Sequence, residues 1–195
     1  MSANQNIAKL FIISGPSGVG KSTVISELMR LRDDLRFSIS VTTRAKREKE
    51  IDGKDYFFIS DEEFDNLIDN KLLLEHASYV GKRYGTPKTY VEDKLKEGYN
   101  IILDIEVQGA AQVKELKPEA ISFFIMPPDD IELERRLRGR KTDSDEKIAQ
   151  RLHQAKEECK LADQYDYVII NDNPIRAAKE IERIISKESK KMEED

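Results

Sequence analysis

The feature that most constrains this chain is the segment "GPSGVGKS" at residues 15–22, which fits the pattern GxxxxGK[ST]. The run before it, "LFIIS" (10–14), is short and apolar, as a buried strand is, and "STVISELMRL" (22–31) spaces its apolar residues as a helix does. Phosphate-binding loops of this pattern connect a strand to a helix. The context therefore favours such a loop over a glycine-rich turn with an incidental lysine.

Each part of the loop has a predicted role at a nucleoside triphosphate. Small residues let successive backbone N–H groups surround phosphate oxygens, and the helix N-terminus adds partial positive charge. Lys21 would bridge the outer phosphates, and the Ser22 hydroxyl would bind Mg²⁺ together with Asp104, which ends the strand "IILDI". The residues expected to contact ATP are Gly15, Pro16, Ser17, Gly18, Val19, Gly20, Lys21, Ser22 and Thr23. The loop itself leaves open whether water, a hydroxyl or a phosphate accepts the terminal phosphate.

Strand and helix patterns alternate along much of the remaining chain. Buried strands are predicted at 100–106, 120–126 and 167–171, and helices at 108–116 and from Pro174 onwards. This alternation predicts an α/β fold, a P-loop NTPase-type parallel sheet flanked by helices. Residues 37–95 are richer in strand patterns, so they are interpreted as an inserted β-rich subdomain, with a capped helix predicted at 60–70.

Composition limits the classes of function. A chain of 195 residues with a net charge of −5 has no overall field that would attract nucleic acid. A single cysteine, Cys159, excludes an internal disulfide bond, and no N-terminal apolar stretch resembles a signal peptide or membrane span. A soluble, cytoplasmic protein without nucleic-acid or membrane partners is expected. Any anion binding must then be local.

Two arginine-rich segments allow more than one interpretation. In "SVTTRAKREKEIDGKDY" (40–56), Arg44 and Arg47 could form a forked clamp for a monophosphate, yet a solvated charged loop is the commoner meaning of such a run. In "ELERRLRGRKTDSDEKIAQRL" (132–152), Arg136 and Arg140 share a helical face, with Arg151 further on. A basic solvated helix face explains that pattern equally well.

Six segments in one order resolve these alternatives: "GPSGVGKST", "FSISVTTRAKR", "DGKDYFF", "LLEHASYVGKRYGTP", "ILDIEVQG" and "IMPPDDIELERRLRGR". Through them the chain resembles the guanylate kinase family over nearly its whole length. The resemblance implies transfer of the γ-phosphate of ATP-Mg²⁺ to GMP, and also to dGMP, within purine metabolism. It also implies one domain with three parts: a core (8–36, 96–128 and 160–190), a GMP-binding subdomain (37–95) and a helical lid (129–159).

The resemblance further implies roles for individual residues. The GMP phosphate would be clamped by Arg44, Arg47, Tyr56 and Tyr84, and the base read by Ser40, Glu75 and Thr86. Asp104 and Glu106 would serve the metal's water and the guanine amino group. Transfer would depend on Lys21, Arg44, Arg136, Arg140 and Arg151. Donor and acceptor logic supports the base assignment, because a carboxylate complements the guanine N1–H and 2-amino group, whereas adenine would present a lone pair to it.

Three rival functions differ from this one in the residues they need. Guanylate-kinase-like scaffold modules, which bind peptides, generally have a damaged glycine loop and incomplete phosphate clamps, and both are intact here. A kinase for another monophosphate would not match Glu75, and the net charge disfavours a P-loop protein that binds RNA. The acceptor is already anionic, so no general base is expected, and His76 and His153 are interpreted as surface or packing residues. Monomer and homo-oligomer stay open.

Overall fold

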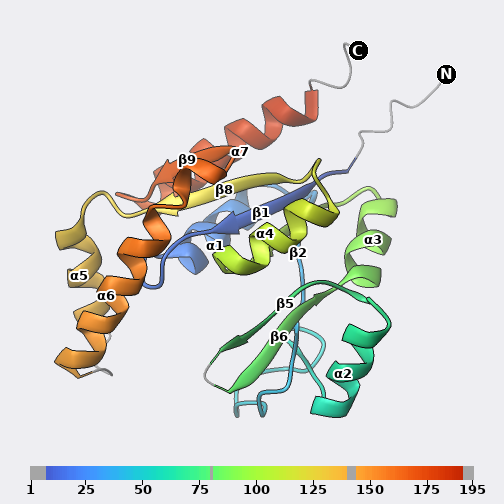
Figure 1. The fold of residues 1–195 in the computed structure, drawn as a ribbon. Coiled ribbons are helices and arrows are strands. Elements are labelled where there is room, and N and C mark those ends of the chain that lie inside the picture. Colours follow the sequence, from blue (N-terminus) through green and yellow to red (C-terminus); the bar gives the residue numbers. More distant parts are fainter. Residues whose placement is uncertain (1–7, 80, 140–143, 191–195) are drawn as a thin grey trace.

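The computed structural model describes residues 8–79, 81–139 and 144–190, and its centre is a five-stranded sheet in the order β2-β7-β1-β8-β9 (Figure 1). All neighbouring strands in this sheet are parallel. Its strands are β1 (Leu10–Ser14), β2 (Leu35–Phe37), β7 (Asn100–Asp104), β8 (Ile121–Met126) and β9 (Tyr167–Ile170). The glycine loop follows β1, and Asp104 ends the neighbouring β7. Both therefore lie at the carboxyl edge, where sheets of this kind bind ligands.

Helices cover both faces of this sheet, which is why β1 is buried at every position and apolar from Leu10 to Ile13. On one face, Phe11 and Ile13 pack with the buried sides of α1 (Lys21–Leu31) and α7 (Pro174–Lys190). On the other face, Leu10 and Ile12 pack with α3 (Lys88–Lys96) and α4 (Val107–Leu116). The alternation of side chains along β1 thus divides the core into two layers.

A second, smaller sheet is built from the segment between β2 and α3. Its order is β4-β3-β6-β5, with β3 and β4 parallel and the other pairs antiparallel. The strands are β3 (Val41–Thr42), β4 (Phe57–Phe58), β5 (Leu73–Tyr79) and β6 (Lys82–Pro87). Helix α2 (Asp61–Asp69) inserts Phe64 into a small core with Val41 and Leu73. The capping box of α2, in which the Ser60 hydroxyl accepts from the Glu63 N–H, is confirmed.

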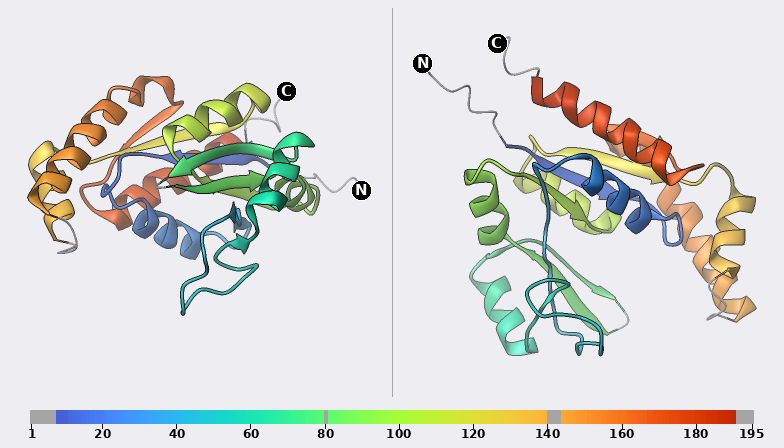
Figure 2. Two further views of the ribbon diagram at one scale, coloured as in Figure 1. Left: turned by 60° about the horizontal axis from the view of Figure 1, so that its bottom comes forward. Right: turned by 180° about the vertical axis from the view of Figure 1, so that it is seen from behind.

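Two further helices form a separate arm, α5 (Asp130–Arg138) and α6 (Asp145–Cys159), followed by a short 3-10 helix, η1 (Ala162–Gln164). Leu133 and Leu137 of α5 pack with Ile148 and Ala155 of α6, so the arm has its own small core. Figure 2 shows the arm and the small sheet on opposite sides of the large sheet's carboxyl edge. The loop that begins α1 lies between them. Residue 140 lies outside the described residues, and with it the predicted catalytic Arg140.

The expected α/β fold is confirmed, including the parallel sheet and its flanking helices. Several elements were not predicted, among them β2, β3, α3 and η1. Strand β2 has only three residues, and α3, "KTYVEDKLK", buries only Val91 fully, so neither carries a clear hydrophobic pattern. The division into core, GMP-binding subdomain and lid stays a prediction. Within the described ranges, no helix combines the length and the apolar character that crossing a membrane requires.

Candidate active site

The glycine loop presents an open helix end to the solvent. Gly20 is the N-cap of α1, with a φ of 96° and no side-chain cap. The first N–H groups of α1 are therefore not satisfied by a capping side chain and can meet an anion. At the other end of the loop, a Cβ on Gly15 would come within 2.3 Å of the Ile125 carbonyl oxygen. Glycine is required there because the loop crosses β8 at backbone contact distance.

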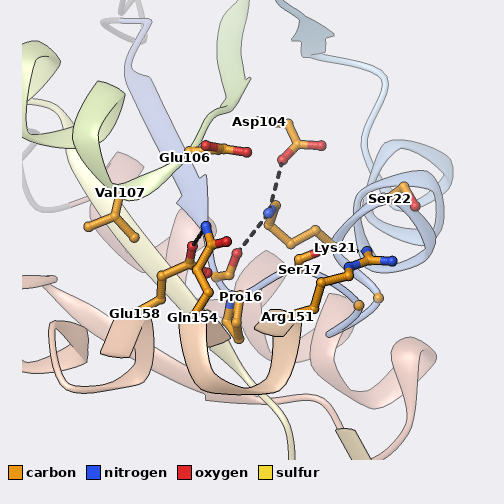
Figure 3. Close-up of a pocket in the computed structure, with 13 residues that line it drawn as sticks. Pro16, Ser17, Lys21, Ser22, Asp104, Glu106, Val107, Arg151, Gln154 and Glu158 are labelled. Carbon is orange, nitrogen blue, oxygen red and sulfur yellow. Dashed lines mark hydrogen bonds and ion pairs between the residues drawn. The ribbon is translucent and has the colours of Figure 1, made fainter. Parts of the chain in front are cut away.

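Lys21 reaches from the loop toward the end of β7. Its Nζ donates a hydrogen bond to the Gly15 carbonyl at 2.8 Å and lies 3.9 Å from Asp104 Oδ1 (Figure 3). Burial raises the pKa of the Asp104 carboxyl, and the Lys21 ammonium acts in the opposite direction. The cation and the carboxylate are thus held at the same edge of the sheet by two different strand ends.

The first cavity lies between this loop and helix α6. It is lined by the loop, by Asp104 and Glu106 after β7, and by Arg151, Gln154 and Glu158 of α6 (Figure 3). Arg151 Nη2 donates to the Ser17 hydroxyl at 2.6 Å, and Gln154 Nε2 donates to Glu158 Oε1 at 2.8 Å. Burial is the main cause that raises the pKa of Glu158. The arm therefore contributes polar side chains to the phosphate side of the site.

Gln154 and Glu158 were missed by the sequence analysis. A signal for them existed, because they follow Arg151 by three and seven residues and so share its face of α6. Arg151 was predicted because an arginine suits a phosphate group, and a glutamine and a glutamate carry no such signal. The three side chains nevertheless line the same cavity from one face of α6.

A second cavity adjoins the first and is lined by residues in and beside the small sheet and by residues at the end of β7. Ser40, Tyr56, Glu75 and Tyr84 line it, together with Gly109 at the start of α4. Lys21, Asp104 and Glu106 line both cavities. Residues as far apart in the sequence as Lys21 and Gly109 thus line one cavity. Asp104, at the end of β7, lies where the two cavities adjoin.

Glu75 is the most deeply buried of the carboxylates in the second cavity. Its residue is 6% exposed, and the hydroxyl of Thr86, directly opposite on β6, donates to Oε1 at 2.7 Å. Burial raises the pKa of Glu75, while the Thr86 hydrogen bond opposes that rise. A buried carboxylate with one fixed hydroxyl neighbour can select a ligand edge that carries N–H donors.

Arg44 lies beside Tyr56, but its guanidinium is already paired with the carboxylate of Glu50. Its Nη1 and Nη2 donate to the two oxygens of Glu50 at 3.0 and 2.7 Å, and its guanidinium is 5.4 Å from the Tyr56 ring centroid. The Tyr56 and Tyr84 rings are 6.0 Å apart. Arg44 holds the pKa of Glu50 at about 2. Arg47 is exposed, and its backbone N–H donates to Glu50 at 2.8 Å, so the same carboxylate joins both arginine positions.

Arg136 has a different environment from the one its predicted role suggests. It donates from Nη1 to the Val19 carbonyl at 2.7 Å and from Nη2 to the Asn171 carbonyl at 2.9 Å. Its guanidinium therefore holds the backbone of the glycine loop at Val19 by a hydrogen bond. Arg136 lines neither the first nor the second cavity. Of the arm arginines, Arg151 reaches the first cavity directly.

The oxygen donors near Lys21 fit a magnesium ion that arrives with a nucleotide. Ser22 and Asp104 line the same cavity, and Glu106 is nearby. Among the described residues no three His, Cys, Asp or Glu side chains gather as a cage for a metal. Mg²⁺ keeps several waters and is commonly bound by one or two protein oxygens plus phosphates, so a hydroxyl and one carboxylate suit it.

The parallel sheet, the loop after its β1 strand and the second cavity beside it define a P-loop kinase. A structure titled TT1252 from Thermus thermophilus has the same fold, with a TM-score of 0.52 at 15% identity, covering 93% of this chain and 97% of that one. A family model described as guanylate kinase matches residues 7–188. This chain belongs to the guanylate kinase family.

Individual relatives agree with that membership. A guanylate kinase of Streptococcus thermophilus is 52% identical over 94% of this chain and 88% of its own length. A guanylate kinase of Lactococcus lactis subsp. lactis is 50% identical over 92% of this chain and 87% of its own. The crystal structure of guanylate kinase from Anaplasma phagocytophilum, at 36% identity, has a TM-score of 0.76 and covers 95% of this chain and 88% of that one.

Proposed function

We propose that this chain is an ATP:GMP phosphotransferase, which transfers the γ-phosphate of ATP to GMP and releases ADP and GDP. The observation that carries the proposal is the junction of two cavities at Lys21 and Asp104. One cavity has the backbone donors and the cation that a triphosphate needs, and the other has a buried carboxylate suited to a base. Relatives about 50% identical over most of the chain bear the same name.

The first cavity would take ATP. The N–H groups of the loop and of the α1 N-terminus surround the β-phosphate, and Lys21 exchanges its Gly15 carbonyl for phosphate oxygens. Ser22 and Asp104 would hold the Mg²⁺ that binds with ATP, and the ion would neutralise charge that develops on the phosphates. Arg151 is already at the loop and stabilises the moving phosphoryl group, while Arg136 keeps the loop backbone in shape.

The second cavity would take GMP. Glu75 would accept from the guanine N1–H and 2-amino group, with Ser40 lining the same cavity. Thr86 is fully buried and lies outside the cavity lining, and its hydroxyl holds the Glu75 carboxylate. Adenine would present an unprotonated N1 to the buried carboxylate and leave it unpaired, which is strongly unfavourable. We extend the proposal to dGMP, since no residue of this set is assigned to the 2′-hydroxyl.

Transfer requires the GMP phosphate to face the ATP terminus. Arg44 lies beside Tyr56 and Tyr84 and would exchange Glu50 for the doubly charged phosphate, a stronger bidentate partner. A phosphate oxygen of GMP then attacks the γ-phosphorus in line, and ADP leaves. The attacking oxygen is already anionic, so the chain needs no base, which agrees with the exposed position of His76. We infer that residues 37–95 form the GMP-binding part and 129–159 the lid, in a cytoplasmic enzyme of purine nucleotide metabolism.

The proposal is tested by following ADP formation from ATP-Mg²⁺ with GMP, dGMP, AMP, UMP and CMP offered one at a time. Turnover with GMP should exceed that with AMP by at least about 10⁴-fold in kcat/KM, as for other sites that hydrogen-bond a polar substrate edge. Turnover with AMP and none with GMP would overturn it. A chain that binds GMP without any turnover would instead support a non-catalytic binding module.

A further inference from the structure

Helix α4 of the core contacts strand β5 of the small sheet directly beside Glu75. The side-chain amide of Gln112 forms two hydrogen bonds with the backbone of His76, the residue after Glu75. Gln112 Oε1 accepts from the His76 N–H at 3.1 Å, and Gln112 Nε2 donates to the His76 carbonyl at 3.0 Å. A carboxamide has the same donor and acceptor arrangement as a peptide group, so Gln112 pairs with this strand as another strand would.

The position of β5 in its sheet explains why such pairing matters. β5 is an edge strand, with β6 on one side only. Its outward backbone N–H and C=O groups have no neighbouring strand, so they need another hydrogen-bonding partner. The pairing with β6 also shifts register between Leu73 and Glu75. Without Gln112, the strand would be least constrained at the residue that carries the buried carboxylate.

A second residue of α4 sets the place of that carboxylate. Gly109 lies three residues before Gln112, on the same face of the helix. A Cβ at Gly109 would come within 2.7 Å of Glu75 Oε2 and 3.2 Å of its Cδ. The Glu75 side chain thus lies against the first turn of α4, with Thr86 holding its other oxygen at 2.7 Å. Any larger side chain at 109 would displace the carboxylate.

We propose that Gln112 is a positioning residue for guanine recognition: its pairing with His76 fixes Glu75 in the space that Gly109 leaves open. This inference rests on the proposed function, because it concerns how the same cavity distinguishes bases. Gln112 itself lines neither the first cavity (the loop cavity) nor the second cavity (the base cavity), so it acts through Glu75. Specificity for guanine then depends on a residue of the core as well as on the small sheet.

The test compares Gln112→Ala and Gln112→Met with Gln108→Ala, which removes an exposed glutamine from the same helix. Met keeps the length of the side chain but removes both polar groups, so it separates hydrogen bonding from packing. For each protein, KM is measured for GMP and for ATP, and kcat/KM for GMP and IMP. IMP lacks the 2-amino group that Glu75 would contact but keeps N1–H, so it reports how well the carboxylate is placed.

Both Gln112 variants should raise the KM for GMP about tenfold, because two hydrogen bonds that hold the strand are lost. Their preference for GMP over IMP should fall by a similar factor, with the KM for ATP within twofold of the wild type and thermal unfolding still cooperative. Gly109→Ala should lower the same preference. The inference is overturned if the Gln112 variants match Gln108→Ala, or if KM for ATP and GMP rise together. A wild type that does not use GMP would instead refute the proposed function.

Discussion

The two cavities of this protein are built in different ways. The loop cavity takes its donors from consecutive backbone groups at residues 15–22, placed by one strand and one helix. The base cavity takes side chains from positions scattered between Ser40 and Gly109, and these meet only because a second sheet folds against α4. Recognition of phosphate can therefore be encoded locally, whereas recognition of a base depends on the register of distant strands.

The cavities also differ in electrostatic character. The loop cavity combines an uncapped helix N-terminus with the Lys21 ammonium, which suits an anion. In the base cavity the most buried charge is the carboxylate of Glu75, whose pKa is raised by its removal from water. The two cavities therefore suit different chemical groups, an anionic phosphate chain in one and a base edge that carries N–H donors in the other. Lys21, Asp104 and Glu106 line both.

Removing the loop cation should produce the largest effect and separate the cavities most clearly. Lys21→Ala should lower kcat by about 10² to 10³, because a preorganised positive group is lost where negative charge develops. Lys21 lines both cavities, but its ammonium hydrogen-bonds to the loop at Gly15, so ATP binding should fall more than GMP binding when each is measured alone by calorimetry. Lys96→Ala, at an exposed lysine of α3, is the control. Normal turnover by Lys21→Ala would show that the first cavity is not the triphosphate site.

Arg44 lies beside Tyr56 but does not line the base cavity in this structure, and its substitution tests the proposed phosphate clamp. Arg44→Ala should reduce kcat/KM for GMP by about 10- to 100-fold, since a bidentate charge-assisted contact to the acceptor phosphate is lost. The KM for ATP should be nearly unchanged. Lys46→Ala, at an exposed cation of the same loop, should behave like the wild type. If both variants retained full activity, the segment would be a solvated charged loop and the clamp assignment would be wrong.

Acidification should weaken the base cavity through protonation of Glu75. The raised pKa of Glu75 means that this carboxyl takes up a proton at a higher pH than the ordinary value of about 4.3. Protonated Glu75 cannot accept from both guanine donors, so kcat/KM for GMP should fall about tenfold per pH unit below that raised pKa. Glu75→Gln should lack this limb. Titration of the GMP phosphate affects both proteins equally, so it cancels when the wild-type kcat/KM is divided by that of Glu75→Gln at each pH. If this ratio did not change with pH, the assignment of Glu75 to guanine would be wrong.

The smallest effect concerns a part of the small sheet that touches neither ligand. Ser60→Ala removes the N-cap of α2 and should lower the free energy of unfolding by about 1 kcal/mol. Thermal unfolding should then shift by about 2–4 °C. Kinetic constants should stay at wild-type values, as they should for Ser26→Ala on α1. A change in KM for GMP would mean that α2 positions the base cavity more directly than its contacts indicate.

The glycine loop and the parallel sheet could be predicted because their signals are local: a contiguous pattern for the loop and apolar runs for the strands. The orientation of Arg136 could not be predicted, because it donates to the backbone carbonyls of Val19 and Asn171, which are distant in sequence. Every residue has a backbone carbonyl, so the residue type does not indicate which one will accept. Gln112 was missed for the same reason, because it binds the backbone of His76. Side chains that hydrogen-bond to backbone groups are therefore the part of such a site that is hardest to predict from sequence.

The most direct test of the two-cavity account is to measure the binding of GMP and of ATP separately to Glu75→Gln. Glutamine keeps the size of the side chain and the hydrogen bond from Thr86, but it presents an N–H where guanine also has donors. The account predicts that affinity for GMP falls at least tenfold, that the preference over AMP erodes, and that affinity for ATP stays within twofold. Unchanged GMP binding, or an equal loss for both nucleotides, would contradict it.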